Sequence, residues 1–159
     1  MPIPPWMPQL VEVNPWTADT FDLLYAVFQA QLALPVRLTL DGRRVSFFQD
    51  MDDGKELMFW HLTHREDKAT TSYIPEPQRC ARLSWVAAML SNAHQPEVTR
   101  WDYAESNGNV CTYLWLREHD YVVVLKKFPS GDYRLITAHC VDISMKRSTL
   151  ESKYRKRVV

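Results

Sequence analysis

The last third of the chain consists of short strand-like segments separated by tight turns, and this pattern restricts the possible folds most strongly. Residues 98–104, 111–118, 121–128 and 133–142 are rich in β-branched and aromatic side chains. The segments between them, "ESNGN", "HD" and "PSGD", are short and have turn composition. Strands joined by such short turns must be antiparallel neighbours. The sequence therefore predicts an antiparallel meander.

Two earlier segments have the spacing of helices. In residues 17–33 the large apolar side chains recur every three or four positions, Thr17 is suited to cap the first turn, and Pro35 ends the segment. Residues 78–93 show a second apolar stripe of this kind. The first stripe consists of Phe21, Leu24, Tyr25, Phe28 and Leu32.

Further strands are expected between the two helices. A hairpin is predicted where "VRLTL" and "VSFFQ" flank the turn pair Asp41–Gly42. Residues 57–66, "LMFWHLTHRE", are expected to form a strand, and residues 67–78 a loop. The fold class expected is α+β, with N-terminal helices packed on a mostly antiparallel sheet of about four to six strands.

Composition suggests one domain with two distinct ends. A chain of 159 residues is long enough to bury one core. Residues 1–16 hold five prolines and two tryptophans, which predicts an extended arm that packs on the rest. Residues 17–145 would form the single α+β domain, and the basic segment 146–159 a terminal helix or a mobile tail.

Charge and cysteine content restrict the location and the partners. Lys plus Arg and Asp plus Glu both number 19, so the net charge does not indicate a polyanionic partner. The three cysteines are widely spaced and form no CxxC motif, which favours reduced thiols and a cytoplasmic location. No apolar run reaches the roughly 18 residues needed to span a membrane, so no membrane association is expected.

Polar side chains interrupt otherwise apolar strands at several points. Because side chains alternate across a strand, Thr137 and His139 are expected on one face together with Leu135. The same reasoning aligns His61 with Arg65, away from His64, and places Tyr113, Trp115 and Arg117 on one aromatic and cationic surface. The second helix adds Arg79 and Arg82.

Such a set has the parts needed for metal-free RNA cleavage. His61 and His139 would act as general base and acid, in an order left open, because imidazole titrates near neutral pH. Arginine forks stabilise the charge that develops on phosphorus, Thr137 can donate a hydrogen bond to phosphate, and aromatic rings can stack on unpaired bases. The candidate catalytic residues are His61, His139, Thr137 and Arg117, and the candidate RNA-binding residues are Arg65, Arg79, Arg82, Trp115, Tyr113 and Lys153.

Less specific interpretations remain open. The histidines can be structural, with His64 on the surface; Arg79 and Arg82 can form a solvated face; and the tryptophans can belong to the core. A metal site would use His61, His64, Cys80 or His139, but no second close pair of ligands supports it. No cysteine lies at a recognisable nucleophile turn, and no glycine-rich phosphate loop is present. We therefore expect no cofactor and no metal.

The segments "HLTHRED", "PQRCARLSW", "YLWLREHDYVVVL" and "YRLITAHCVD", in this order, resemble the barnase–EndoU–colicin–RelE (BECR) class of small ribonucleases, in particular its prophage-associated members. The resemblance covers roughly residues 45–145 and implies N-terminal helices against a four-stranded antiparallel sheet and metal-free activity on tRNA, mRNA or ribosome-bound RNA. It also implies a role as a toxin or phage-borne effector, with an antitoxin or immunity protein as a possible partner. The residues that match its functional positions are His61, Arg79, Arg82, Arg117, Thr137 and His139.

The N-terminal arm and the first helix depart from this class. They leave a second hypothesis open, a non-enzymatic module of a phage or toxin–antitoxin system that binds RNA or a partner protein. In that case the histidines would be structural, and the arm and basic tail would make the contacts.

Overall fold

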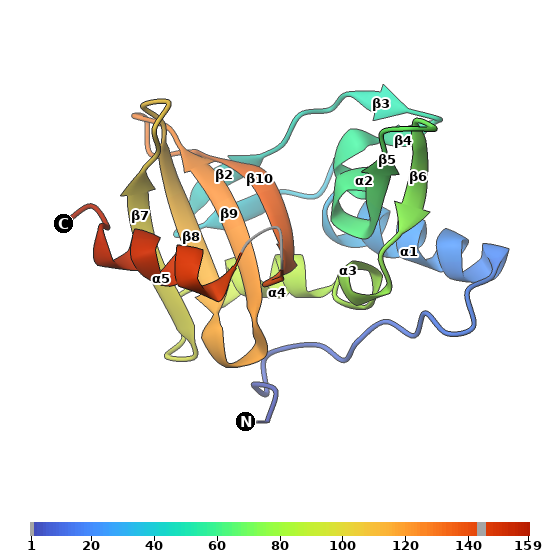
Figure 1. Ribbon diagram of the computed structural model, residues 1–159, viewed down its shortest axis with the longest axis horizontal. Coiled ribbons are helices and arrows are strands. Elements are labelled where there is room, and N and C mark those ends of the chain that lie inside the picture. Colours follow the sequence, from blue (N-terminus) through green and yellow to red (C-terminus); the bar gives the residue numbers. More distant parts are fainter. Residues whose placement is uncertain (1, 143–145) are drawn as a thin grey trace.

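A six-stranded sheet forms the centre of the computed structural model, which describes residues 2–142 and 146–159 (Figure 1). All neighbouring strands are antiparallel except β2 and β10, which are parallel. The predicted α+β class with a mostly antiparallel sheet is therefore confirmed. Across the sheet the strands are β1 (Leu38–Leu40), β2 (Arg43–Ser46), β10 (Tyr133–Cys140), β9 (Tyr121–Lys127), β8 (Val110–Leu116) and β7 (Val98–Ala104).

The first helix and the first hairpin form where the sequence predicts them. Helix α1 (Ala18–Gln31) begins after Thr17, whose hydroxyl accepts a hydrogen bond from the backbone N–H of Thr20. This bond satisfies one of the free N–H groups at the helix start. The turn between β1 and β2 has positive φ at both Asp41 and Gly42, the conformation that suits a two-residue hairpin turn.

The prediction of a strand over residues 57–66 is wrong for most of its length. Residues Leu57–Thr63 form helix α2, and only the end of the segment is extended. The aromatic and apolar residues of this segment suit either structure, and a helix of seven residues is too short for its periodicity to decide. Burial follows the helical period, because Phe59 and Leu62 are in the core while Leu57 and His61 are exposed.

The loop predicted over residues 67–78 also contains regular structure, because two strands pair there as a separate hairpin. The second predicted helix is interrupted after Ala81, and the basic tail holds a helix that lies on the sheet (Figure 1). The remaining elements are β3 (Met51–Asp52), β4 (Lys55–Glu56), β5 (His64–Asp67), β6 (Ser72–Pro75), α3 (Pro77–Ala81), α4 (Trp85–Ser91), the 3₁₀ turn η1 (Arg117–His119) and α5 (Arg147–Arg155).

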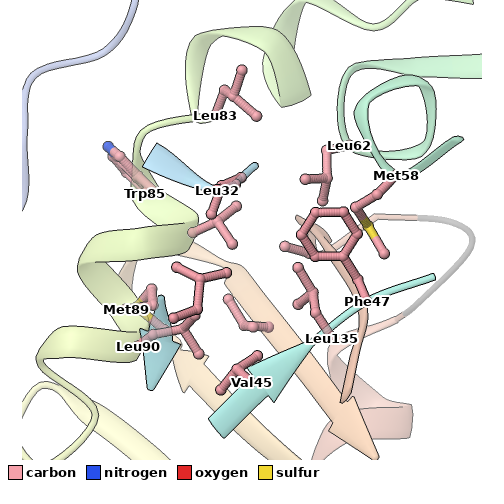
Figure 2. Packing of buried hydrophobic residues seen from close by; sticks show 14 of the residues in the cluster. Leu32, Val45, Phe47, Met58, Leu62, Leu83, Trp85, Met89, Leu90 and Leu135 are labelled. Carbon is pink, nitrogen blue, oxygen red and sulfur yellow. The ribbon is translucent and has the colours of Figure 1, made fainter. Parts of the chain in front are cut away.

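The larger hydrophobic core lies on one face of the sheet, here called the inner face. Figure 2 shows side chains from α2, α4, β2 and β10 meeting there. Phe59 of α2 is fully buried at the end of this core, with its ring centroid 5.0 to 5.8 Å from those of Phe21, Tyr25 and Phe28. These ring contacts fix α2 relative to α1.

The opposite face, here called the outer face, carries a second and smaller core under α5. Leu150 of α5 is fully buried against Trp101, Tyr113 and Trp115. The sequence predicted an exposed aromatic and cationic surface on β8, and this prediction is wrong because α5 covers it. Sequence periodicity identified the shared face of Tyr113 and Trp115 but could not reveal that a distant helix packs on it.

The N-terminal arm contains no helix or strand between residues 2 and 16, yet it packs on the domain. Met7 is buried in the larger core. The backbone N–H of Val11 donates to the carbonyl of Ala81, and the indole N–H of Trp85 donates to the carbonyl of Pro8. Among the described residues no helix is long and apolar enough to cross a membrane.

The helical geometry of α2 can be tested by comparing Phe59→Ala with Leu57→Ala. On a strand the two side chains would lie on one face, and the two alanine substitutions would lower the free energy of unfolding by similar amounts. On the helix we expect Phe59→Ala to lower the free energy of unfolding by about 3–5 kcal/mol and Leu57→Ala by less than about 1 kcal/mol, because only Phe59 leaves a cavity. Urea unfolding of both variants measures this, and equal losses would contradict the helix.

Candidate functional site

The candidate site lies where one edge of β10 is left open. Strand β2 pairs with β10 only at Tyr133 and Arg134. Beyond Arg134 helices α2 and α3, rather than a strand, pack beside β10. Side chains of these helices can therefore reach the residues of β10 from the side.

A bulge in β10 determines which residues face outward at this edge. The pairing with β9 shifts between Leu135, which is opposite Leu125, and Thr137, which is opposite Val124. Leu135 belongs to the larger core on the inner face, whereas Val124 belongs to the smaller core on the outer face. The prediction that Leu135 and Thr137 share a face is therefore wrong, because Ile136 adds one residue to the strand.

Thr137 and His139 do share the outer face, as the sequence predicted. Their partners on β9 are Val124 and Val122, two residues apart and both in the smaller core. His139 is 7% exposed, and its Nδ1 lies 2.8 Å from the carbonyl oxygen of Cys140. A carbonyl oxygen can only accept, so Nδ1 carries a proton and Nε2 is the ring atom left for other partners.

Helix α2 brings His61 to this edge. Its Nε2 lies 2.8 Å from the hydroxyl oxygen of Thr137, across 76 residues of sequence. Arg79 of α3 holds the end of α2, since its Nη1 donates to the carbonyl oxygens of His61 at 3.3 Å and His64 at 3.2 Å. The guanidinium group has five N–H donors, so others are left for a ligand.

The surroundings of His61 favour its neutral form. Part of the side chain is exposed, but the protein around the ring removes enough hydration to lower the pKa of His61 below 6.5. The positive charge of Arg79 lowers this pKa further, and so does His139. An imidazole held neutral at pH 7 can accept a proton, which is the property of a general base.

A pocket of about 540 Å³ opens beside His61. Arg79 and Ile136 line it together with His61. One wall holds Trp60 and Tyr73, whose rings stack with centroids 4.4 Å apart. Two further lining residues are exposed apolar side chains, Phe48 and Leu57. His61 and Arg79 line this pocket, whereas Thr137 and His139 are not among its lining residues. The candidate site thus consists of the aromatic pocket and the adjoining outer face of β10, which His61 connects through its contact with Thr137.

Of the other two arginines predicted near the site, Arg65 reaches this pocket and Arg82 does not. Arg65 lines the pocket and forms an ion pair with Glu76 at 3.2 Å. Its predicted alignment with His61 along one strand is wrong, because α2 ends between the two residues. Arg82 does not line the pocket, since its guanidinium lies 5.1 Å from the ring centroid of Trp85 and donates to Gln78.

The remaining predicted residues lie on the outer face, beneath or beside α5 or, in the case of Lys153, on α5 itself. Arg117 pairs with Glu151 of α5 at 2.6 Å and covers the ring of Trp115. Lys153 donates to the hydroxyl of Tyr113 at 2.7 Å and pairs with Glu105. Trp115 and Tyr113 are 0% and 2% exposed, so in this conformation neither ring can stack on a base. The structure does not bring these four side chains to the pocket.

His64 is buried rather than on the surface, contrary to the prediction. It is 4% exposed, its Nδ1 lies 2.6 Å from the hydroxyl of Thr63, and aromatic rings including Trp16 and Trp60 surround it. Burial among these rings lowers the pKa of His64 from 6.5 to about 4. This histidine therefore has a structural position next to the site.

Comparisons with known proteins add no family. No family model, no curated protein and no solved structure matches the chain. Among residues 2–142 and 146–159, no group of three or more His, Cys, Asp or Glu side chains could hold a metal ion.

Sequence reasoning missed the aromatic part of the site. Phe48, Trp60 and Tyr73 come from three separate segments, and each is the kind of residue that a core also requires. The hydroxyl of Tyr73 donates to Asp52 at 2.5 Å, which raises the pKa of Tyr73 to about 12. Asp52 of β3 and Tyr73 of β6 meet here across 21 residues of sequence, and the sequence did not signal this contact.

The low pKa of His64 predicts a pH dependence of stability. Because the folded-state pKa is about 4 and the unfolded value is 6.5, the unfolded chain binds the extra proton first as the pH falls. The contribution of neutral His64 to the free energy of unfolding is thus complete above pH 6.5 and is lost as the pH falls from 6.5 to about 4. We expect His64→Gln to remove about 3 kcal/mol of this loss, measured by urea unfolding across that range. The exposed His94→Gln is the control, and parallel curves for His64→Gln and wild type would contradict the burial of a neutral imidazole.

Proposed function

We propose that the protein is a metal-independent endoribonuclease that cleaves RNA by transesterification at the 2′-hydroxyl. The observation that carries the proposal is the hydrogen-bond distance between His61 Nε2 and Thr137 Oγ1, with Arg79 and His139 close enough to lower the pKa of His61. Base, hydroxyl donor, fixed cation and second imidazole are the groups that this reaction needs.

The roles follow from the chemistry of each group. Neutral His61 takes the proton of the 2′-hydroxyl after Nε2 exchanges Thr137 for the substrate. The 2′-oxygen attacks phosphorus, the bond from phosphorus to the 5′-oxygen breaks, and that oxygen takes a proton from His139. The products are a 2′,3′-cyclic phosphate and a free 5′-hydroxyl. Arg79 and the hydroxyl of Thr137 stabilise the charge on the non-bridging oxygens.

The resemblance to the BECR ribonucleases agrees with this chemistry at His61, Arg79, Thr137 and His139. A role as a toxin or prophage effector, and an antitoxin or immunity protein as partner, follow from that resemblance only. Arg117 and Lys153 are omitted from the proposed mechanism, because both are paired with carboxylates at the far side of the outer face.

A binding module without enzymatic activity is the second candidate function. The observation that favours it is the set of exposed apolar side chains beside the pocket, since Phe48 is 60% exposed and Ile136 is 41% exposed. Exposed apolar side chains of this kind can bind RNA or a partner protein without any cleavage reaction.

An RNA cleavage assay in EDTA separates the two candidates. We expect wild type to cleave single-stranded RNA and His61→Ala and His139→Ala to lose about 10²–10⁴-fold in rate, the usual contribution of one general acid or base. Thr137→Val should lose about five-fold, because one neutral hydrogen bond is worth about 1 kcal/mol. His94→Ala, on an exposed histidine, should cleave like wild type. Equal rates for wild type and His61→Ala would exclude the enzyme and leave the binding module.

A further inference from the structure

We propose that the open half of the outer face binds single-stranded RNA next to His61, through a cation–aromatic strip. The strip consists of Phe48, Lys126, Phe128 and Arg134. The inference rests on the proposed ribonuclease function and specifies its substrate class, which is a single-stranded polyribonucleotide longer than the nucleotides at the cleaved bond.

The register of the sheet places the strip on the same face as Thr137. Lys126 is paired with Arg134 across β9 and β10, and Lys126 is two residues from Val124, which is opposite Thr137. Arg134 and Thr137 are separated by Leu135 on the inner face and by the bulged Ile136. The bulge therefore aligns Arg134 with Thr137, about 10 Å or less along the strand. A neighbouring nucleotide can span this distance.

The cations and rings of the strip alternate. The guanidinium carbon of Arg134 lies 4.1 Å from the ring centroid of Phe48 and 5.0 Å from that of Phe128, so it contacts two rings. The ammonium of Lys126 lies 4.9 Å from the centroid of Phe128. A guanidinium that stacks through its face keeps the N–H groups in its plane free for phosphate.

Among residues 2–142 and 146–159, no acidic side chain forms an ion pair with the cations of the strip, Arg134 and Lys126. The next residue, Lys127, points to the other side of the strand and pairs with Asp102 at 3.0 Å. The chain thus balances the cation on one side of β9 and leaves the cation on the outer face available, which favours a polyanionic ligand.

The strip continues into the pocket beside His61. Phe48 belongs to both, because it contacts Arg134 and lines the pocket with His61 and Ile136. It is 60% exposed although it is a large aromatic residue. If a base stacks on Phe48, the phosphate on one side of that nucleotide would lie near Arg134, and the phosphate on its other side would lie near His61 and Arg79. Base stacking and backbone cations are the usual combination for single strands.

The test measures binding of an uncleavable ligand, so that it does not depend on activity. The probe is a labelled single-stranded RNA of about 12 nucleotides with 2′-O-methyl groups, and binding is followed by fluorescence anisotropy at several salt concentrations. Lys126→Gln/Arg134→Gln is compared with Arg37→Gln/Arg155→Gln, which removes the same charge from exposed side chains elsewhere. Phe48→Ala is measured in parallel.

We expect the strip pair to weaken binding on the order of ten-fold or more. It should also reduce the slope of log affinity against log salt by about 1.4, since each neutralised phosphate of a single strand contributes about 0.7. Phe48→Ala should weaken binding on the order of ten-fold without changing the slope, and the control pair should remain within a few-fold of wild type.

In the binding assay, three results would contradict RNA binding by the strip: no RNA binding by wild type, equal losses for both double variants, or binding of an oligoglutamate peptide in place of RNA. The ribonuclease proposal can fail separately. Wild type that binds the uncleavable RNA through the strip but leaves unmodified RNA intact would retain the strip and exclude the enzyme. Cleavage by the strip pair at the wild-type rate, for short and long RNA alike, would retain the enzyme and exclude the strip.

Discussion

The burial of Phe59 among the rings of Phe21, Tyr25 and Phe28 determines where everything else in the candidate site lies. This contact holds α2 against α1 and beside the sheet, at the edge of β10 that β2 leaves unpaired. Because α2 is a helix, burial of Phe59 turns His61 to the opposite side, toward Thr137. A hydrophobic contact on one side of a seven-residue helix thus positions a polar contact on the other.

The bulge at Ile136 is the second local feature on which the site depends. In a regular strand Ile136 would take the place opposite Val124, and Thr137 would point to the same side as Leu135, into the larger core. With it, Thr137, His139 and Arg134 all face outward on β10. One irregularity in one strand therefore connects the proposed acid–base pair with the proposed RNA strip, and it gives both a common surface.

The fold was more predictable from the sequence than the site. Strong local signals identified α1 with its Thr17 cap, the Asp41–Gly42 hairpin and the C-terminal meander, because periodicity and turn residues act over short distances. The strand predicted over residues 57–66 failed, since tertiary packing rather than propensity decides the structure of a short aromatic segment.

The sequence grouped His61 and Thr137 in one hypothetical site, and the structure brings their side chains together. Strand parity was the wrong basis for this grouping, because His61 lies on a helix and the outward direction of Thr137 depends on a bulge. Thr137 and His139 could be assigned to one face because alternation holds after the bulge. Trp115, Tyr113, Arg117 and Lys153 could not be assigned correctly, because only the three-dimensional structure reveals that α5 covers β8 and that carboxylates pair with the cations.

The pKa of His61, measured by NMR titration of its ring protons in wild type and in Arg79→Gln, tests most directly whether α2, α3 and β10 assemble this site. The proximity of Arg79 and His139 and the loss of hydration predict a pKa below 6.5 in wild type. They also predict a rise toward 6.5 when the charge of Arg79 is removed. A wild-type pKa at or above 6.5 that Arg79→Gln leaves unchanged would contradict the assembled site.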